Sequence, residues 1–283
     1  MSGGEEGKIR HWGIADGKEV GTAMDAGSPV LNIAVSRDGK VIVSGTERGL
    51  VMVWNAGSHS KVSEFRAHRD SVRAVDVSPD ATKIATASND CTACVWSLSN
   101  GEQLLGPLEH DFPVVAAEFS PDGRLFATAT EDHDSVRVYD SRNGSLLVEF
   151  PVRVYSWWNY SLAWASDNKQ LFAFSPNGYI LRVDVSTGTT HSQWPIHSSN
   201  DPMCIALASN GTLIAASAGS SVSLWNTTSQ KQIGTVIKYT HYVASMAISS
   251  NHVLVTSGEK QITLRALFGT LPPLCVQDNV SNW

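Results

Sequence analysis

The chain lacks three features that would assign it to common functional classes: a long apolar run, an excess of positive charge and a secretory leader. None of its apolar runs approaches the roughly 20 residues that a membrane-spanning helix needs. Lys and Arg number 21 against 27 Asp and Glu, so the net charge of −6 offers no broad attraction to nucleic acid or to an anionic membrane. Residues 1–7 contain no apolar secretory segment. We expect a cytoplasmic globular protein whose partners include neither nucleic acid nor membrane.

Cysteine is also scarce. Four cysteines in 283 residues, Cys91, Cys94, Cys204 and Cys275, are too few and too scattered for a disulfide framework. Cys91 and Cys94 form a C-x-x-C pair, but no second pair follows at the spacing of a zinc site. In a strand, a separation of three places two side chains on opposite faces of the sheet. The sequence therefore predicts reduced thiols, no metal site and no cofactor.

What the chain does contain is a repeat. Short strand-like runs end at an aromatic residue or its replacement, at intervals of 42, 42, 43, 44, 42 and 40 residues: Trp12, Trp54, Trp96, Tyr139, Val183, Trp225 and Arg265. Turn-forming stretches with Ser, Asp, Asn and Gly recur at one phase of this period, at residues 36–39, 78–80, 120–123, 166–168 and 209–211. A period of 40 to 45 residues holding four short strands is typical of propeller blades.

The second copy of the repeat shows a family pattern. It reads HRDSVRAVDVSPD over residues 68–80, IATASND over residues 84–90, and then Val95 and Trp96. This copy resembles a WD-repeat β-propeller. The resemblance implies an all-β fold of four-stranded antiparallel blades, and a structural tetrad formed by His68, Thr86, Asp90 and Trp96.

The third copy repeats the spacing. His110 precedes Thr128 by 18 residues, as His68 precedes Thr86, and the family pattern then assigns Asp132 and Tyr139 to the remaining tetrad positions. Residues 106–110 (GPLEH), 118–123 (EFSPDG) and 136–140 (VRVYD) resemble the long WD-repeat arrays of fungi. In the fifth copy Ala215 and Gly219 stand at the hydroxyl and acid positions.

A histidine, a hydroxyl and an aspartate can also indicate a catalytic triad. An active site, however, needs one such group in one cleft with an oxyanion pocket. Here the combination recurs from copy to copy, which favours buried hydrogen-bond networks that stabilise each blade.

The repeats predict six full blades and an N-terminal half blade, an incomplete seven-bladed ring. We expect a flexible tail over residues 1–7, the propeller over residues 8–276 and a second tail over residues 277–283. Residues 8–12 and 19–24 would supply the third and outer strands of the half blade, and residues 270–276 the last outer strand. The chain would then be a piece of a longer protein or an open ring, whose unpaired edge permits self-association.

Two adjacent tryptophans, Trp157 and Trp158, precede the fourth copy's first strand. The resemblance places this loop on the face around the central channel, and the same position in other copies falls at Asp70, Phe112, Asn200 and His241. Large aromatic rings in partly wet loops are frequent binding hot spots. The sequence predicts a partner-binding rim at these residues, with packing of the tryptophans inside their own blade as the alternative.

The function implied by the resemblance is a non-catalytic scaffold for a protein partner, and not an enzyme. The alternative is an enzyme or a propeller that binds a small molecule or a metal ion, with the polar cluster Glu131, Asp132, His133 and Asp134 as its site.

Overall fold

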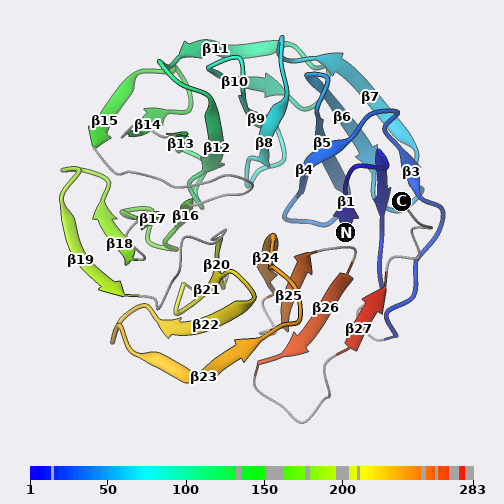
Figure 1. Cartoon of the computed structure of the whole chain (residues 1–283). Coiled ribbons are helices and arrows are strands. Elements are labelled where there is room, and N and C mark those ends of the chain that lie inside the picture. The colour runs from blue at the N-terminus through cyan, green and yellow to red at the C-terminus, as the bar shows by residue number, and fades with distance from the viewer. Residues whose placement is uncertain are drawn as a thin grey trace. The chain divides into compact units, whose positions relative to one another are not determined.

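The computed structural model describes residues 1–13, 16–131, 135–150, 162–175, 179–195, 204–208, 211–249, 253–258, 261–267 and 274–277. Every regular element within these ranges is a β-strand (Figure 1). Across the same ranges we find no helix of the length and apolarity that a membrane crossing requires.

The N-terminal sheet has three short strands in the order β1-β2-β3. These are β1 (Ser2–Gly3), β2 (Lys8–Arg10) and β3 (Met24–Asp25). An isolated bridge between Trp12 and Glu19 continues the pairing beyond β2.

Six four-stranded sheets follow, each an antiparallel meander whose neighbours are consecutive in the chain. The first three comprise β4 (Val30–Val35), β5 (Val41–Thr46), β6 (Leu50–Asn55) and β7 (Lys61–Arg66); β8 (Val72–Val77), β9 (Lys83–Ser88), β10 (Thr92–Ser97) and β11 (Gln103–Glu109); and β12 (Val114–Phe119), β13 (Leu125–Thr130), β14 (Val136–Asp140) and β15 (Leu146–Phe150). The last three comprise β16 (Leu162–Trp164), β17 (Gln170–Ser175), β18 (Tyr179–Asp184) and β19 (Thr190–Pro195); β20 (Ile205–Leu207), β21 (Leu213–Ala218), β22 (Ser221–Asn226) and β23 (Gln232–Lys238); and β24 (Ser245–Ile248), β25 (Val253–Gly258), β26 (Gln261–Ala266) and β27 (Leu274–Gln277).

In the sheets that begin with β4, β8 and β12, a serine holds the turn between the first and second strands. Ser78 Oγ donates to Asp80 Oδ1 at 2.6 Å and accepts from the Lys83 backbone N–H at 2.9 Å. Ser36 and Ser120 make the same two kinds of contact in their own sheets. Because Ser and Asp side chains bond nearby backbone groups, this pattern closes a tight turn.

Two compact units divide the chain, one holding β1 to β15 and the other β16 to β27. In the first, Val43 and Val51 of one sheet pack against Val72 and Val75 of the next. In the second, Phe172 and Ile180 pack against Ile214 in the same manner. Apolar side chains between neighbouring sheets therefore form the core within each unit. Four-stranded meanders packed in this way are the blades of a β-propeller, so the predicted fold class is confirmed.

Side chains of one sheet also hold the backbone of the next. Asn32 Oδ1 in β4 accepts a hydrogen bond from the Val75 N–H in β8 at 3.0 Å. Asp76 Oδ2 in β8 accepts from the Phe119 N–H in β12 at 2.8 Å, while its Oδ1 accepts from Val77. We refer to these two contacts, from Asn32 to Val75 and from Asp76 to Phe119, as the inter-sheet clasps.

The N-terminal sheet differs from the predicted half blade. Residues 2–3, which were expected to lie in a flexible tail, pair with β2 as a third strand. A Cβ at Gly3 would lie 2.7–2.8 Å from the side chains of Ile33 and Val30, so a larger residue there would force these side chains to move. A two-residue Ser-Gly strand has no apolar alternation, and sequence periodicity therefore could not detect it.

At the other end of the chain, β27 covers residues 274–277. It overlaps the predicted outer strand, residues 270–276, and ends one residue later. Residues 270–273 and 278–283 lie outside the described residues.

Candidate functional site

The tetrad residues of the sheet β8–β11 form one continuous hydrogen-bond chain. The indole N–H of Trp96 donates to Thr86 Oγ1 at 2.9 Å, and Thr86 Oγ1 lies 2.7 Å from His68 Nε2. His68 Nδ1 lies 3.1 Å from Asp90 Oδ2. The side chains of His68, Thr86 and Trp96 are buried. The family resemblance predicted that these four residues interact. Each forms a hydrogen bond with another of the four, so none is available as a nucleophile or a base.

The electrostatics of this network follow from burial. Desolvation lowers the pKa of His68 and outweighs the opposing charge of Asp90, so the imidazole stays neutral at pH 7. Burial would raise the pKa of Asp90, but hydrogen bonds from Thr92 and from the Arg69 backbone hold it below its ordinary value. The carboxylate is therefore ionised and accepts the Nδ1–H of His68.

The sheet β12–β15 has a different arrangement around His110. Thr128 Oγ1 and Tyr139 Oη each lie 3.4 Å from His110 Nε2. Arg137 donates from Nη1 to the Glu109 carbonyl oxygen at 3.0 Å and approaches His110 Nδ1 at 3.4 Å. Asp132, the predicted fourth member, lies outside the described residues.

Strand register explains how Arg137 reaches the histidine. Arg137 pairs with Thr128 on one side and with Glu149 on the other, and its Nε donates to Glu149 Oε1 at 2.9 Å. In the preceding sheet Cys94 pairs with Thr86 and thus occupies the position of Arg137. Sequence reasoning missed Arg137. The signal was available, because a long cation replaces a small thiol at an equivalent strand position.

A guanidinium group can only donate, so Nδ1 of His110 accepts and its ring proton lies on Nε2. His68 has the opposite tautomer, because its Nδ1 faces a carboxylate. Burial and the charge of Arg137 lower the pKa of His110 to about 4, which keeps the ring neutral at physiological pH.

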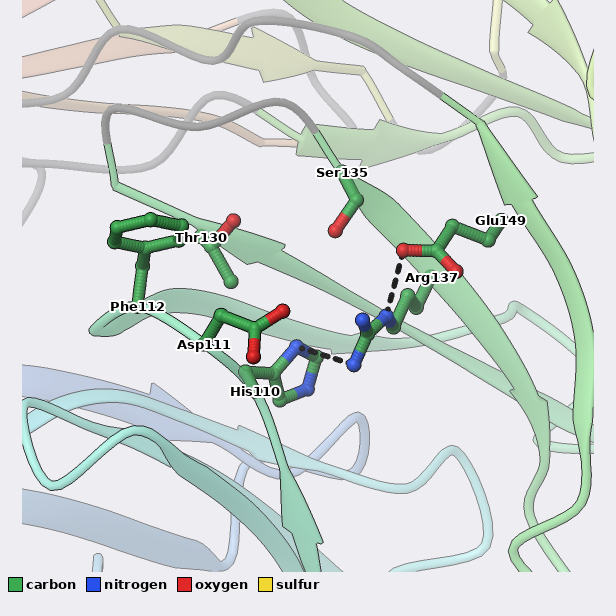
Figure 2. Close-up of a pocket in the computed structure, with 7 residues that line it drawn as sticks. All are labelled: His110, Asp111, Phe112, Thr130, Ser135, Arg137 and Glu149. Carbon is green, nitrogen blue, oxygen red and sulfur yellow. Dashed lines mark hydrogen bonds and ion pairs between the residues drawn. The ribbon is translucent and has the colours of Figure 1, made fainter.

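A pocket of about 200 Å³ opens beside Arg137 (Figure 2). Figure 2 shows the guanidinium of Arg137 between His110 and Glu149, with Phe112 on the opposite side of the pocket. The lining residues are His110, Asp111, Phe112, Thr130, Ser135, Arg137 and Glu149. The pocket is polar, and its two carboxylates outnumber its single cation.

Trp54 and Trp225 show how far the hydrogen-bond pattern extends to other sheets. In the first four-stranded sheet the Trp54 indole donates to Ser44 Oγ at 3.0 Å, as Trp96 does to Thr86. In the fifth repeat Trp225 pairs with Ile214, which places Ala216 at the hydroxyl position. The prediction of Ala215 was wrong by one residue.

The one-residue error comes from the turn that precedes β21. The Ala208 N–H donates to the Leu213 carbonyl, as the Ser78 N–H donates to Lys83, so Ala208 and not Ser209 is the counterpart of Ser78. The indole of Trp225 donates instead to Ser223 Oγ of its own strand at 2.8 Å, since the side chain of Ala216 offers no acceptor.

Three of the predicted rim residues lie in loops that join the last strand of one sheet to the first strand of the next. We name these the entry loops, residues 67–71, 110–113 and 239–244. Asp70 is exposed, Phe112 is 36% exposed, and His241 is half-buried with Nδ1 3.2 Å from Thr240 Oγ1. Trp157, Trp158 and Asn200 lie outside the described residues.

Two other candidate sites for chemistry are the C-x-x-C pair, Cys91 and Cys94, and the acidic cluster over residues 131–134. Cys94 is buried, and burial raises the pKa of its thiol to about 12, so it stays protonated and unreactive. Among the described residues, no three His, Cys, Asp or Glu side chains gather closely enough to hold a metal ion. Of the acidic cluster, Asp132, His133 and Asp134 lie outside the described residues.

Comparison with protein families gives a match to the WD domain, G-beta repeat, over residues 17–55, 59–97, 102–140 and 185–226. These segments cover more than half of the chain. The chain belongs to the WD-repeat family. A comparison with curated proteins finds no match. In WD-repeat proteins the propeller generally serves as a scaffold for protein interactions. Each of the four matched segments ends one residue after the aromatic position of its repeat, which is Trp54, Trp96, Tyr139 or Trp225.

Proposed function

We propose that the protein is a non-catalytic scaffold that binds a protein partner through its entry loops. The observation that carries this proposal is the contrast between interior and loops. His68, Thr86 and Trp96 of the second repeat are buried and linked by hydrogen bonds. Asp70 and Phe112, which lie in two successive entry loops, are exposed. Aromatic side chains, phenylalanine among them, are enriched at protein interfaces.

The pocket beside Phe112 supports a specific mode of contact. Its volume of about 200 Å³ is smaller than the roughly 300–1,000 Å³ typical of small-molecule sites, which favours one partner side chain over a cofactor or metabolite. Asp111 and Glu149 face one paired cation, Arg137, and a histidine that stays neutral. Because the negative charge is in excess, a basic side chain of the partner fits best.

The test compares partner recovery by variants of the entry loops and of the outer strands. The protein and its Phe112→Ala, Asp111→Asn double variant are used as bait in a cytoplasmic extract, with recovered proteins quantified by mass spectrometry. Val62→Ala and Leu147→Ala remove exposed apolar side chains of β7 and β15, 64% and 54% exposed, and serve as matched controls. We expect a partner that the double variant loses and both controls retain.

A Trp157→Ala, Trp158→Ala variant extends the test to the predicted part of the rim. Circular dichroism of each variant checks that the fold is retained. Equal recovery by the wild type and by both loop variants would remove the entry loops from the proposal. Localisation in the cytoplasm and self-association through an open sheet edge remain predictions, to be checked by fractionation and by sedimentation.

A further inference from the structure

Two histidines from distant parts of the chain face each other beside the N-terminal sheet. His11 follows β2, and His59 lies in the turn between β6 and β7, 48 residues later. Nδ1 of His11 and Nε2 of His59 are 3.4 Å apart, with ring centroids 5.6 Å apart and planes inclined by 59°. Both rings are half-buried, so the pair keeps access to solvent.

A contact on the far side of the ring from His11 fixes the orientation of His59. Its Nδ1 lies 3.0 Å from the backbone carbonyl oxygen of Thr22. A carbonyl only accepts, so the proton is on Nδ1 and the Nε2 lone pair points toward His11. A ring N–H bonded to a backbone carbonyl is the arrangement that orients imidazoles in metal sites.

Gly21 makes this orientation possible. Its φ of +74° is readily adopted by glycine, and a Cβ there would lie 2.5 Å from both Cε1 and Nδ1 of His59. The chain therefore passes directly against the ring, which places the next carbonyl, that of Thr22, at the Nδ1 atom.

His11 is suited to the same role. Its Nδ1 atom faces His59. A neutral imidazole can carry its proton on either nitrogen. With the proton on Nε2, the Nδ1 lone pair faces that of His59.

The separation of the two nitrogens matches a metal ligand pair. Imidazole nitrogens lie about 2.1 Å from Zn²⁺, and two such ligands of a tetrahedral ion are about 3.4 Å apart. The observed distance of 3.4 Å equals this value. Without metal, the same distance permits only a long N–H···N contact.

We propose that His11 and His59 form a binding site for a divalent transition-metal ion of the class that prefers imidazole, such as Zn²⁺, Cu²⁺ or Ni²⁺. Water fills the remaining coordination positions. The bound ion links the N-terminal sheet to the β6–β7 turn and restrains both. This site goes beyond the scaffold function and does not depend on it, because neither histidine belongs to an entry loop.

The first experiment is calorimetric titration of the chelator-treated full chain with zinc chloride at pH 7.5. We expect one ion per chain, and at least tenfold weaker binding in His11→Ala and in His59→Ala. His191→Ala is the control, since His191 is an exposed histidine whose Nε2 lies 3.5 Å from Asp184. Absence of stoichiometric binding to the wild type, or equal binding by all four proteins, would overturn the proposal.

A second measurement keeps the test independent of variant folding. Electron paramagnetic resonance of the wild type with one equivalent of Cu²⁺ should show coupling to two imidazole nitrogens. Hydrogen exchange of residues 8–12 and 22–25 should slow on addition of zinc, while exchange of β12–β15 stays unchanged. A spectrum with one nitrogen, or exchange unaffected in residues 8–12, contradicts a site shared by His11 and His59.

Discussion

Arg137 approaches the Nδ1 atom of His110 at 3.4 Å, the atom that in His68 faces the carboxylate of Asp90. Two equivalent histidines in neighbouring sheets therefore meet partners of opposite charge. The ring of His68 donates at Nδ1, and the ring of His110 accepts at Nδ1. Both rings are buried and neutral.

This difference predicts distinct tautomers. In ¹⁵N NMR spectra at pH 7, His68 should show the Nδ1–H form and His110 the Nε2–H form. In an Arg137→Gln variant the donor at Nδ1 of His110 is removed or weakened, so its Nε2–H preference should decline while His68 is unchanged. Identical tautomers in the wild type would contradict the assigned role of Arg137.

The hydroxyl group of Thr86 contacts two buried partners, whereas that of Ser44 contacts one, so we predict that their removal lowers the free energy of unfolding by different amounts. Thr86→Val strands both His68 Nε2 and the Trp96 indole, whereas Ser44→Ala strands the Trp54 indole. Each stranded buried group costs about 1–3 kcal/mol. In urea denaturation, Thr86→Val should therefore lower the apparent stability more than Ser44→Ala. The reverse order would mean that the His68 contact contributes little.

Asp76 predicts a pH dependence of stability. Desolvation raises the pKa of this carboxyl to about 6, despite backbone hydrogen bonds from Phe119 and Val77. A raised pKa means that the folded state favours the protonated form, so the contribution is complete below about pH 4 and is lost as pH rises through 6. Relative to Asp76→Asn, the wild type should lose about 1–3 kcal/mol between pH 4 and pH 7.

Urea denaturation of both proteins at intervals of half a pH unit checks the effect of Asp76. A difference between them that does not vary with pH, or that grows in favour of the wild type, contradicts the raised pKa.

The cysteines predict an order of chemical labelling. Burial raises the pKa of Cys94 to about 12 and that of Cys204 to about 11, while Cys91 is only half-buried. Iodoacetamide at pH 8 should therefore modify Cys91 first among these three, as measured by peptide mass spectrometry. Early modification of Cys94, or a disulfide between Cys91 and Cys94, would show that the C-x-x-C pair is accessible after all.

The fold could be predicted from the sequence because its signals are local and repeated. Trp54 and Trp96 each stand ten residues after the hydroxyl to which their indole donates, and the serine turns keep the same phase. Contacts that depend on register within one sheet remain visible in spacing. For this reason the His68 to Trp96 pattern could be read without coordinates.

Other features depend on contacts that spacing does not encode. The pair of His11 and His59 comes from a loop and a turn in different sheets, and β1 has no apolar pattern. The position of Ala216 was missed because an alanine replaces the serine of the preceding turn. Among the rim residues, Asp70 and Phe112 could be predicted as exposed from their place between strands, while Trp157, Trp158 and Asn200 stay predictions.

The inter-sheet clasps have a consequence for how such a chain can evolve. In both, the acceptor is a side chain, Asn32 or Asp76, but the donor is a main-chain N–H of the following repeat. Every residue except proline carries that donor. A repeat can thus be duplicated, exchanged or mutated at the donor position without a compensating substitution in the repeat before it. As long as the acceptor side chain is kept, divergence at the donor position does not break the link between neighbouring blades.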